Sequence, residues 1–246
     1  MKLLETSVPD NLVAVNLSNV ELARMNLIIG DNGTGKTRAL DKIHSSVRER
    51  HGEIDVFTVG GQSFCSSDIK NLNNMKNTGL LSGFSKDIGQ ATSLLRSVEP
   101  SFEKLVETDD EHGIMVKLEG RKELVSINDM SAGFKKLLEI SLKAINLVEG
   151  FLLIDDVDFG LHYTKHEALI KLILDTAKTN ENQVFMTTHN NEFIQSFSDV
   201  TFADNDTDAL LIRMGYSARK SDLGENIATA FDKSVLEGLL RGQVRL

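Results

Sequence analysis

The amino-acid sequence predicts an α/β protein with a mainly parallel central sheet. Two observations support this prediction: apolar runs of strand length, such as 151–155 (FLLID) and 183–188 (QVFMTT), recur along the chain, and segments of helical spacing, such as 132–148, separate them. Strands that alternate with helices are typical of parallel sheets joined by crossover helices. The 246 residues are 41% hydrophobic and 26% charged, which is typical of a globular chain with a sizeable core. We expect residues 1–246 to form a single domain.

The N-terminal part is expected to begin with two short antiparallel strands joined by a turn, at 12–17 (LVAVNL) and 25–29 (MNLII). A glycine-rich loop follows the second strand and leads into a predicted helix over about 36–50. The β-branched run 54–60 (IDVFTVG) is predicted to be a further strand.

The middle of the chain, about 66–113, is rich in Asn, Ser and Lys and contains helical stretches such as 87–106, so we expect an inserted helical lobe there. Residues 114–127 alternate around the turn EGRK and predict a hairpin. Apolar residues at helical spacing predict a helix over 132–148. The remaining expected elements are a strand at 151–155, a helix over about 164–178, a strand at 183–188, a short helix at 191–197, strands at 200–204 and 209–215, and one or two helices within 222–241, so that about 204–246 forms C-terminal strands and helices.

A phosphate-binding loop is predicted at 30–37, because GDNGTGKT matches G-x-x-x-x-G-K-[ST] at every fixed position, after an apolar strand and before a helix. The glycines let backbone N–H groups point inward around a phosphate, and the helix N-terminus adds positive potential. Lys36 is expected to reach the β- and γ-phosphates, and Thr37 to place its hydroxyl on Mg²⁺. The alternative, a glycine-rich turn that binds nothing, is disfavoured by this context. The expected nucleotide-binding residues are Asn32, Gly33, Thr34, Gly35, Lys36, Thr37 and Arg38.

Three further sites contain polar residues at the ends of predicted elements. Asp155 ends an apolar strand, where an aspartate can hold Mg²⁺ directly or through water, or can simply form an acidic turn. His189 follows the strand 183–188 and could bind a γ-phosphate, although a histidine in this place is more often a surface or capping residue. Ser131 is a suitable N-cap residue for the helix predicted over 132–148. Alternatively Ser131, with the backbone up to Gly133, forms a second anion site, which a dimer that buries ATP between its subunits requires.

The motifs at 30–37, 131–133, 152–156 and 187–189 resemble, in order and spacing, the Walker A, signature, Walker B and H-loop motifs of ABC-type ATPases. The resemblance covers about residues 12–203. It implies a P-loop NTPase fold with an ABC-type head, the cofactors ATP and Mg²⁺, and a homodimer that closes around two nucleotides.

The same resemblance assigns roles to individual side chains. It implies that Asp155 holds the metal, that Asp156 polarises the attacking water, that His189 is the H-loop histidine at the γ-phosphate, and that Asp158 lies in the loop that faces the other subunit. Gln62, at the end of a predicted strand, is the candidate for the Q-loop glutamine that senses Mg²⁺ and the γ-phosphate.

Within this superfamily, GDNGTGKT, IDDVDFGLH and TTHNNEF resemble the soluble ATPases of the overcoming-lysogenisation-defect type. Those are related to chromosome-maintenance and recombination ATPase heads, and many act in bacterial and phage defence. Their usual pattern is I-D-E-P-E-x-G-L-H-P, whereas this chain has Asp156 and Asp158 in place of the glutamates and Val157 and Tyr163 in place of the prolines. Aspartate is shorter than glutamate by about 1.5 Å. We therefore expect either slow hydrolysis or, as the alternative, a nucleotide-gated binding module.

Several other function classes are disfavoured. The segment SAG without a following Gly-Gln argues against a transporter ATPase, and no apolar run approaches the roughly 20 residues of a membrane span. We expect a cytoplasmic chain, close to a bare ATPase head, whose effector activity belongs to a partner protein. The net charge of -9 argues against nucleic-acid binding through the overall field, and contact with DNA is left open. Lys135 and Lys136 are expected on a solvated helix face, and His162 and His166 at a solvated helix start rather than at a metal site.

Overall fold

A computed structural model describes residues 22–51, 56–59, 84–107, 114–204, 206, 208–218, 224 and 226–231 of the chain. The strand expected at 12–17, the residue Gln62, and parts of the segments 66–113 and 222–241 lie outside these residues.

The main sheet has six strands in the order β2 (Val56–Val59), β6 (Phe151–Ile154), β7 (Gln183–Thr188), β1 (Met25–Ile29), β8 (Ala209–Tyr216) and β9 (Asn226–Phe231). The neighbouring strands from β2 to β8 pair in parallel, and β9 pairs antiparallel with β8. This confirms the predicted α/β class with a mostly parallel sheet. The carboxyl ends of β1, β6 and β7 therefore meet at one edge of the sheet.

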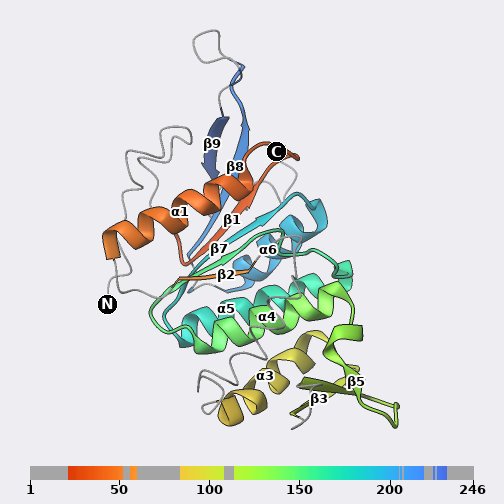
Figure 1. The fold of residues 1–246 in the computed structure, drawn as a ribbon. Coiled ribbons are helices and arrows are strands. Elements are labelled where there is room, and N and C mark those ends of the chain that lie inside the picture. Colours follow the sequence, from red (N-terminus) through yellow and green to blue (C-terminus); the bar gives the residue numbers. More distant parts are fainter. Residues whose placement is uncertain are drawn as a thin grey trace.

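Alternate residues of the strands face two different cores, because successive side chains of a strand point to opposite sides. On one face, Ile28 packs with Leu40 of helix α1 (Lys36–His51). On the other face, Leu27 packs in the larger core that also contains residues of α4 (Ala132–Asn146), α5 (His166–Thr179) and α6 (Asn191–Ala203). Figure 1 shows α1 on one side of the sheet and α4 and α5 on the other. The parallel sheet is therefore covered on both faces, as its apolar strands predict.

A smaller layer lies on the far side of α4 and α5 from the sheet (Figure 1). It consists of α3 (Phe84–Val98), which packs against α4 and α5, and an antiparallel sheet of β3 (Phe102–Glu107), β4 (Ile114–Leu118) and β5 (Val125–Ser126). The predicted hairpin at 114–127 is confirmed, with Met115 opposite Ser126. The helical expectation for 102–106 is wrong. Pro100 disfavours helix for the residue before it and breaks the helical pattern, and the chain continues as a strand.

Two expectations near the C-terminus are also wrong. Residues 200–203, expected in a strand, continue helix α6, because Phe193, Phe197 and Val200 are buried at helical spacing. Packing of that stripe outweighs the strand preference of the β-branched residues. Residues 226–231, expected to be helical, form β9, in which exposed Ile227 and Thr229 alternate with half-buried alanines. Helix α1 and strands β1, β2, β6, β7 and β8 lie where the sequence predicts them.

Candidate functional site

The glycine-rich loop joins β1, which ends at Ile29, to α1, which begins at Lys36. Gly33 and Gly35 have φ values of 85° and 88°, a left-handed conformation that favours glycine. At Gly30 a Cβ atom would lie 2.6 Å from the backbone oxygen of Met214, so the loop packs directly on strand β8. The loop conformation and its contact with β8 therefore both require glycine.

Lys36 points back over this loop. Its Nζ donates hydrogen bonds to the backbone oxygens of Gly30 at 2.7 Å and Asp31 at 3.0 Å, and the side chain is buried. Thr34 is buried as well, and its Oγ1 donates to the Asp31 oxygen at 2.8 Å. Asn32 and Arg38 are exposed at the rim of the loop and on the first turn of α1. The loop thus encloses a single positive charge next to the N-terminus of a helix, an arrangement that suits an anionic ligand.

The structure brings Thr37 and Asp155 together from separate elements. Thr37 Oγ1 donates to Asp155 Oδ2 at 2.8 Å, and Thr187 Oγ1 donates to Asp155 Oδ1 at 2.5 Å. Octahedral Mg²⁺ binds oxygen at about 2.0–2.1 Å, so adjacent ligand oxygens lie about 2.9 Å apart. The Thr37 and Asp155 oxygens therefore fit two neighbouring positions on such an ion.

Asp156 follows at the turn after β6 and has φ 44°, which is uncommon for a residue other than glycine. Its N–H donates to Thr187 Oγ1 at 2.8 Å. Its Oδ1 lies 3.8 Å from Nδ1 of His189, whose side chain is 54% exposed. The carboxylate and the imidazole therefore face each other at the accessible end of β6 and β7.

The third carboxylate, Asp158, is half-buried rather than solvated. Its Oδ1 accepts a hydrogen bond from Thr188 Oγ1 at 2.6 Å, and its Oδ2 accepts one from Asn190 Nδ2 at 3.0 Å. Asp158 therefore ties the loop after β6 to the residues on either side of His189.

Ser131 caps helix α4, with its Oγ accepting a hydrogen bond from the Phe134 N–H at 3.2 Å, so the capping interpretation is confirmed. Ser131 itself is exposed. The backbones of Gly133 and Gly160 are in contact: a Cβ atom on Gly133 would lie 2.0 Å from the Gly160 oxygen. The first turn of α4 and the loop after β6 therefore pack against each other without intervening side chains.

Lys136 was expected on a solvated face, and this expectation is wrong. The side chain is buried, and its Nζ donates to the backbone oxygen of Asp155 at 2.6 Å and to that of Asp156. Burial lowers the pKa of Lys136 to about 8, although the carboxylates around it, Asp156 first, act in the opposite direction. The signal for burial was present, because Lys136 shares the apolar stripe of α4 with Ile140, four residues later.

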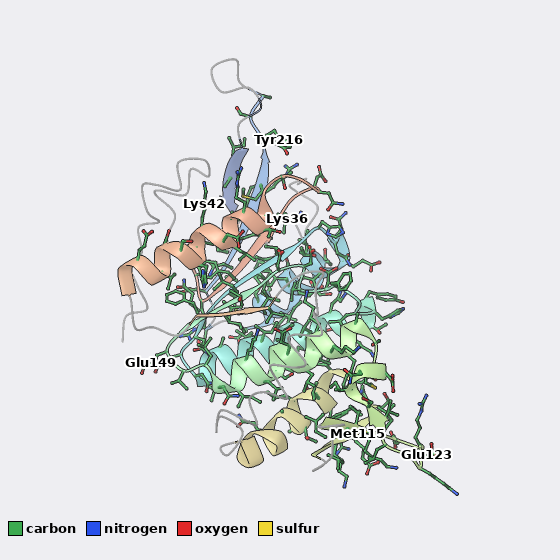
Figure 2. The ribbon with its side chains drawn as sticks, in the orientation of Figure 1. Lys36, Lys42, Met115, Glu123, Glu149 and Tyr216 are labelled. Atoms are coloured by element: carbon green, nitrogen blue, oxygen red, sulfur yellow. The ribbon has the colours of Figure 1, made fainter. Side chains whose placement is uncertain are left out.

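Tyr216 was also missed. Its hydroxyl donates to the Gly33 backbone oxygen at 2.7 Å, and the side chain is 55% exposed. Figure 2 shows Tyr216 and Lys36 near the same end of α1. No sequence motif marks this contact, because 183 residues separate Tyr216 from Gly33.

The two histidines four residues apart do not form a metal site. His166 is buried and packs edge-on against Phe193, with ring centroids 5.2 Å apart, so the expectation of a solvated helix start is wrong for it. His162 interacts with Tyr163 and Thr164. Within the described ranges, no group of three or more His, Cys, Asp or Glu side chains is placed to hold a metal ion. Among the same residues, no helix is long and apolar enough to cross a membrane.

Comparison with protein families and curated proteins identifies relatives of parts of the chain. A family model described as AAA ATPase domain matches residues 66–194. An ATP/GTP phosphatase from Helicobacter pylori is 33% identical over 90 residues, which are 35% of this chain and 24% of that protein. An uncharacterized protein from Methanocaldococcus jannaschii is 38% identical over 65 residues, 26% of this chain and 57% of that protein. The chain thus spans less than two thirds of either relative.

Solved structures share the fold at low identity. The SMC head bound to the C-winged helix domain of ScpA has a TM-score of 0.58 at 14% identity, covering 88% of this chain and 93% of that chain. The SMC head domain from Thermotoga maritima has a TM-score of 0.50 at 13% identity, covering 86% and 92%. The archaeal ribosome recycling factor aABCE1, solved with the stalk protein aP1, has a TM-score of 0.51 at 12% identity, covering 91% and 42%. The fold is therefore that of the P-loop ATPase heads of SMC and ABC proteins.

Proposed function

The chain belongs to the AAA ATPase domain family, and we propose that it binds ATP with Mg²⁺ and hydrolyses it as a homodimer that encloses two nucleotides. The family match and the fold of P-loop ATPase heads support the ATPase part of this proposal. The relative from Helicobacter pylori, an ATP/GTP phosphatase, supports the same chemistry. We propose further that residues 1–246 form one cytoplasmic ABC-type domain with an inserted lobe over about 66–113.

One observation carries the proposal. The hydroxyl of Thr37 and the carboxylate of Asp155, 118 residues apart in the chain, meet at 2.8 Å where β1 and β6 end. Lys36, adjacent to Thr37, holds its ammonium over the glycine loop. Two oxygen ligands that fit Mg²⁺ thus lie beside a cationic loop that suits a triphosphate, as phosphoryl transfer requires.

Each residue of the site has a separate task in the proposed reaction. The N–H groups of the loop 30–37 and the Lys36 ammonium bind the β- and γ-phosphates. Thr37 and Asp155 would hold Mg²⁺, which would supply positive charge to the phosphate oxygens. Asp156 orients the attacking water and accepts its proton, and the accessible His189, 3.8 Å away, donates a hydrogen bond to the γ-phosphate.

The second nucleotide-facing surface is proposed at the start of α4. Ser131 is exposed there, and the N-terminus of a helix attracts anions. Ser131 and the backbone up to Gly133 in one subunit would face the triphosphate held by the other subunit. ATP would then stabilise the dimer, because it contacts both subunits.

The biological process in which the chain acts is proposed from three sequence motifs. GDNGTGKT, IDDVDFGLH and TTHNNEF are similar to the soluble ATPases of the overcoming-lysogenisation-defect type. We propose that this chain drives or gates a partner protein in phage defence, counter-defence or DNA maintenance.

ATP turnover and mass in solution test the proposal. Wild type should hydrolyse ATP with Mg²⁺ and stop when EDTA removes the metal. Lys36→Ala should lose ATP binding, whereas Lys42→Ala, six residues along the same helix, should bind like wild type. Asp156→Asn should bind ATP, accumulate as a dimer and turn over at least about tenfold more slowly. If Lys36→Ala binds ATP as tightly as Lys42→Ala, the phosphate-loop argument is wrong. If wild type binds ATP and dimerises without turnover, the chain is a nucleotide-gated module.

A further inference from the structure

Lys136 is a charged side chain in the interior, with 3% of its surface exposed. Lysine is almost never fully buried unless its ammonium is paired. Here the ammonium donates to the backbone oxygens of Asp155, at 2.6 Å, and of Asp156. Its partners are thus two consecutive carbonyls of the turn that carries the proposed metal ligand and the proposed catalytic carboxylate.

The peptide unit between Asp155 and Asp156 is held at both ends. Its oxygen accepts the hydrogen bond from Lys136, and its N–H, that of Asp156, donates to Thr187 Oγ1 at 2.8 Å. Because a peptide unit is planar, two such bonds fix the orientation of the whole plane. The plane in turn sets the direction in which the Asp156 side chain leaves the backbone. Asp156 has φ 44°, a conformation that the surroundings must maintain in a residue other than glycine.

A second contact joins the same two elements. The backbone of Gly133, one turn before Lys136 on α4, touches Gly160 in the loop after β6. Helix α4 therefore holds this loop at its beginning, through Lys136, and at its end, through Gly133.

We propose that Lys136 is a positioning residue that aims the Asp156 carboxylate by holding the carbonyls of Asp155 and Asp156. This inference rests on the proposed function, since it assigns Lys136 a task in the hydrolysis that Asp156 promotes. Lys136 also links Asp156 to α4, the helix that Ser131 caps, so the two surfaces proposed to face ATP belong to one packed unit.

Steady-state ATP hydrolysis and MgATP binding of four proteins test this role: wild type, Lys136→Met, Lys136→Arg and Lys135→Met. Methionine keeps the unbranched chain and removes the donors, whereas arginine keeps donors for both carbonyls. Lys135 is the matched control, because it is the neighbouring lysine on α4, is only half-buried, and donates to the Asn128 oxygen at 2.6 Å, away from the turn.

Lys136→Met should lower kcat by about 100-fold, the cost of misplacing a catalytic group by about 1 Å. Its Kd for MgATP should stay within about threefold of wild type, because Lys36 is unchanged and the Asp155 carboxylate is still held by Thr37 and Thr187. Lys136→Arg should recover part of the lost kcat, and Lys135→Met should match wild type. Should Lys136→Met not fold, Lys136→Gln replaces it. Its amide ends about 1.5 Å short of the lysine ammonium, so its kcat should also fall by more than about threefold, and a kcat within about threefold of wild type refutes the role.

The role is refuted if kcat of Lys136→Met stays within about threefold of wild type, or if its kcat falls only in proportion to a loss of folded protein or of MgATP affinity. These results differ from a failure of the proposed function. In that case wild type itself does not hydrolyse ATP, or Lys36→Ala hydrolyses it as fast as wild type.

Discussion

Replacing Thr187 with valine removes one hydroxyl that serves two partners. Thr187 is fully buried, and its Oγ1 donates to Asp155 Oδ1 at 2.5 Å while it accepts from the Asp156 N–H at 2.8 Å. Valine has nearly the same shape, so the effect isolates the hydrogen bonds. A hydrogen bond to a charged group contributes about 1.5–3 kcal/mol, and a buried N–H left without a partner costs about 1–3 kcal/mol. Asp155 keeps the bond from Thr37, which reduces the first contribution.

We therefore expect Thr187→Val to lower the free energy of unfolding by about 2–4 kcal/mol. With a urea m-value of about 2–3 kcal/mol/M, the unfolding midpoint falls by about 1 M. Thr201→Val is the control: Thr201 is equally buried, but its hydroxyl donates only to helix carbonyls of Phe197 and Ser198. Urea unfolding followed by circular dichroism measures both midpoints. If the two variants unfold within about 0.3 M of each other, Thr187 does not hold this turn in the way the geometry indicates.

Three further predictions concern other parts of the fold. Gly160→Ala should lower the free energy of unfolding by about 2 kcal/mol or more, and with it the urea midpoint. The reason is that φ at Gly160 is +74° and the new Cβ would lie 2.7 Å from the Gly133 nitrogen. In the control Gly89→Ala, where nothing lies within 4 Å of the new Cβ, the urea midpoint should be equal or higher. Tyr216→Phe removes the hydrogen bond to Gly33 and should raise the Kd for MgATP about two- to fivefold by calorimetry, whereas Tyr163→Phe should not change it. Burial lowers the pKa of His166 below its ordinary value of 6.5, so the unfolded chain binds a proton more readily than the folded one. The contribution of neutral His166 to the free energy of unfolding is therefore complete above about pH 6.5 and is lost as the pH falls below that value. From about pH 7.5 to about pH 5.5, the urea midpoint of His166→Phe should fall less than that of wild type.

The parts of the fold and site that the sequence predicted are those encoded by local pattern. The loop 30–37 carries its strand, its glycines and its helix within a few consecutive residues, and continuous apolar runs mark the strands at 151–154 and 183–188. The position of Asp155 next to Thr37 follows from the rule that parallel strands end at the same edge of the sheet.

The features that were missed depend on contacts between distant segments. Lys136 shares the apolar stripe of α4, but the two carbonyls that accept its hydrogen bonds lie 19 and 20 residues further along the chain. Tyr216 has no local signal at all. The end of α6 and the strand β9 were misassigned because packing against neighbouring elements decided between two conformations that the local sequence allows.

The short carboxylate at position 156 has to be considered together with the backbone that carries it. Two different elements hold the peptide before it, α4 through Lys136 and β7 through Thr187. The position of the carboxylate therefore depends on the orientation of that peptide as much as on the length of the side chain.

Restoring the missing methylene in Asp156→Glu would extend the side chain by about 1.5 Å along a direction fixed for aspartate. If the turn is built around the shorter side chain, Asp156→Glu should slow hydrolysis in the otherwise wild-type chain and change little when combined with Lys136→Met, which releases the turn. If the chain has merely lost reach, Asp156→Glu should speed hydrolysis, and the gain should shrink in the same double variant. Whether Asp156→Glu alone slows or speeds hydrolysis therefore distinguishes a turn built around aspartate from a carboxylate that is too short.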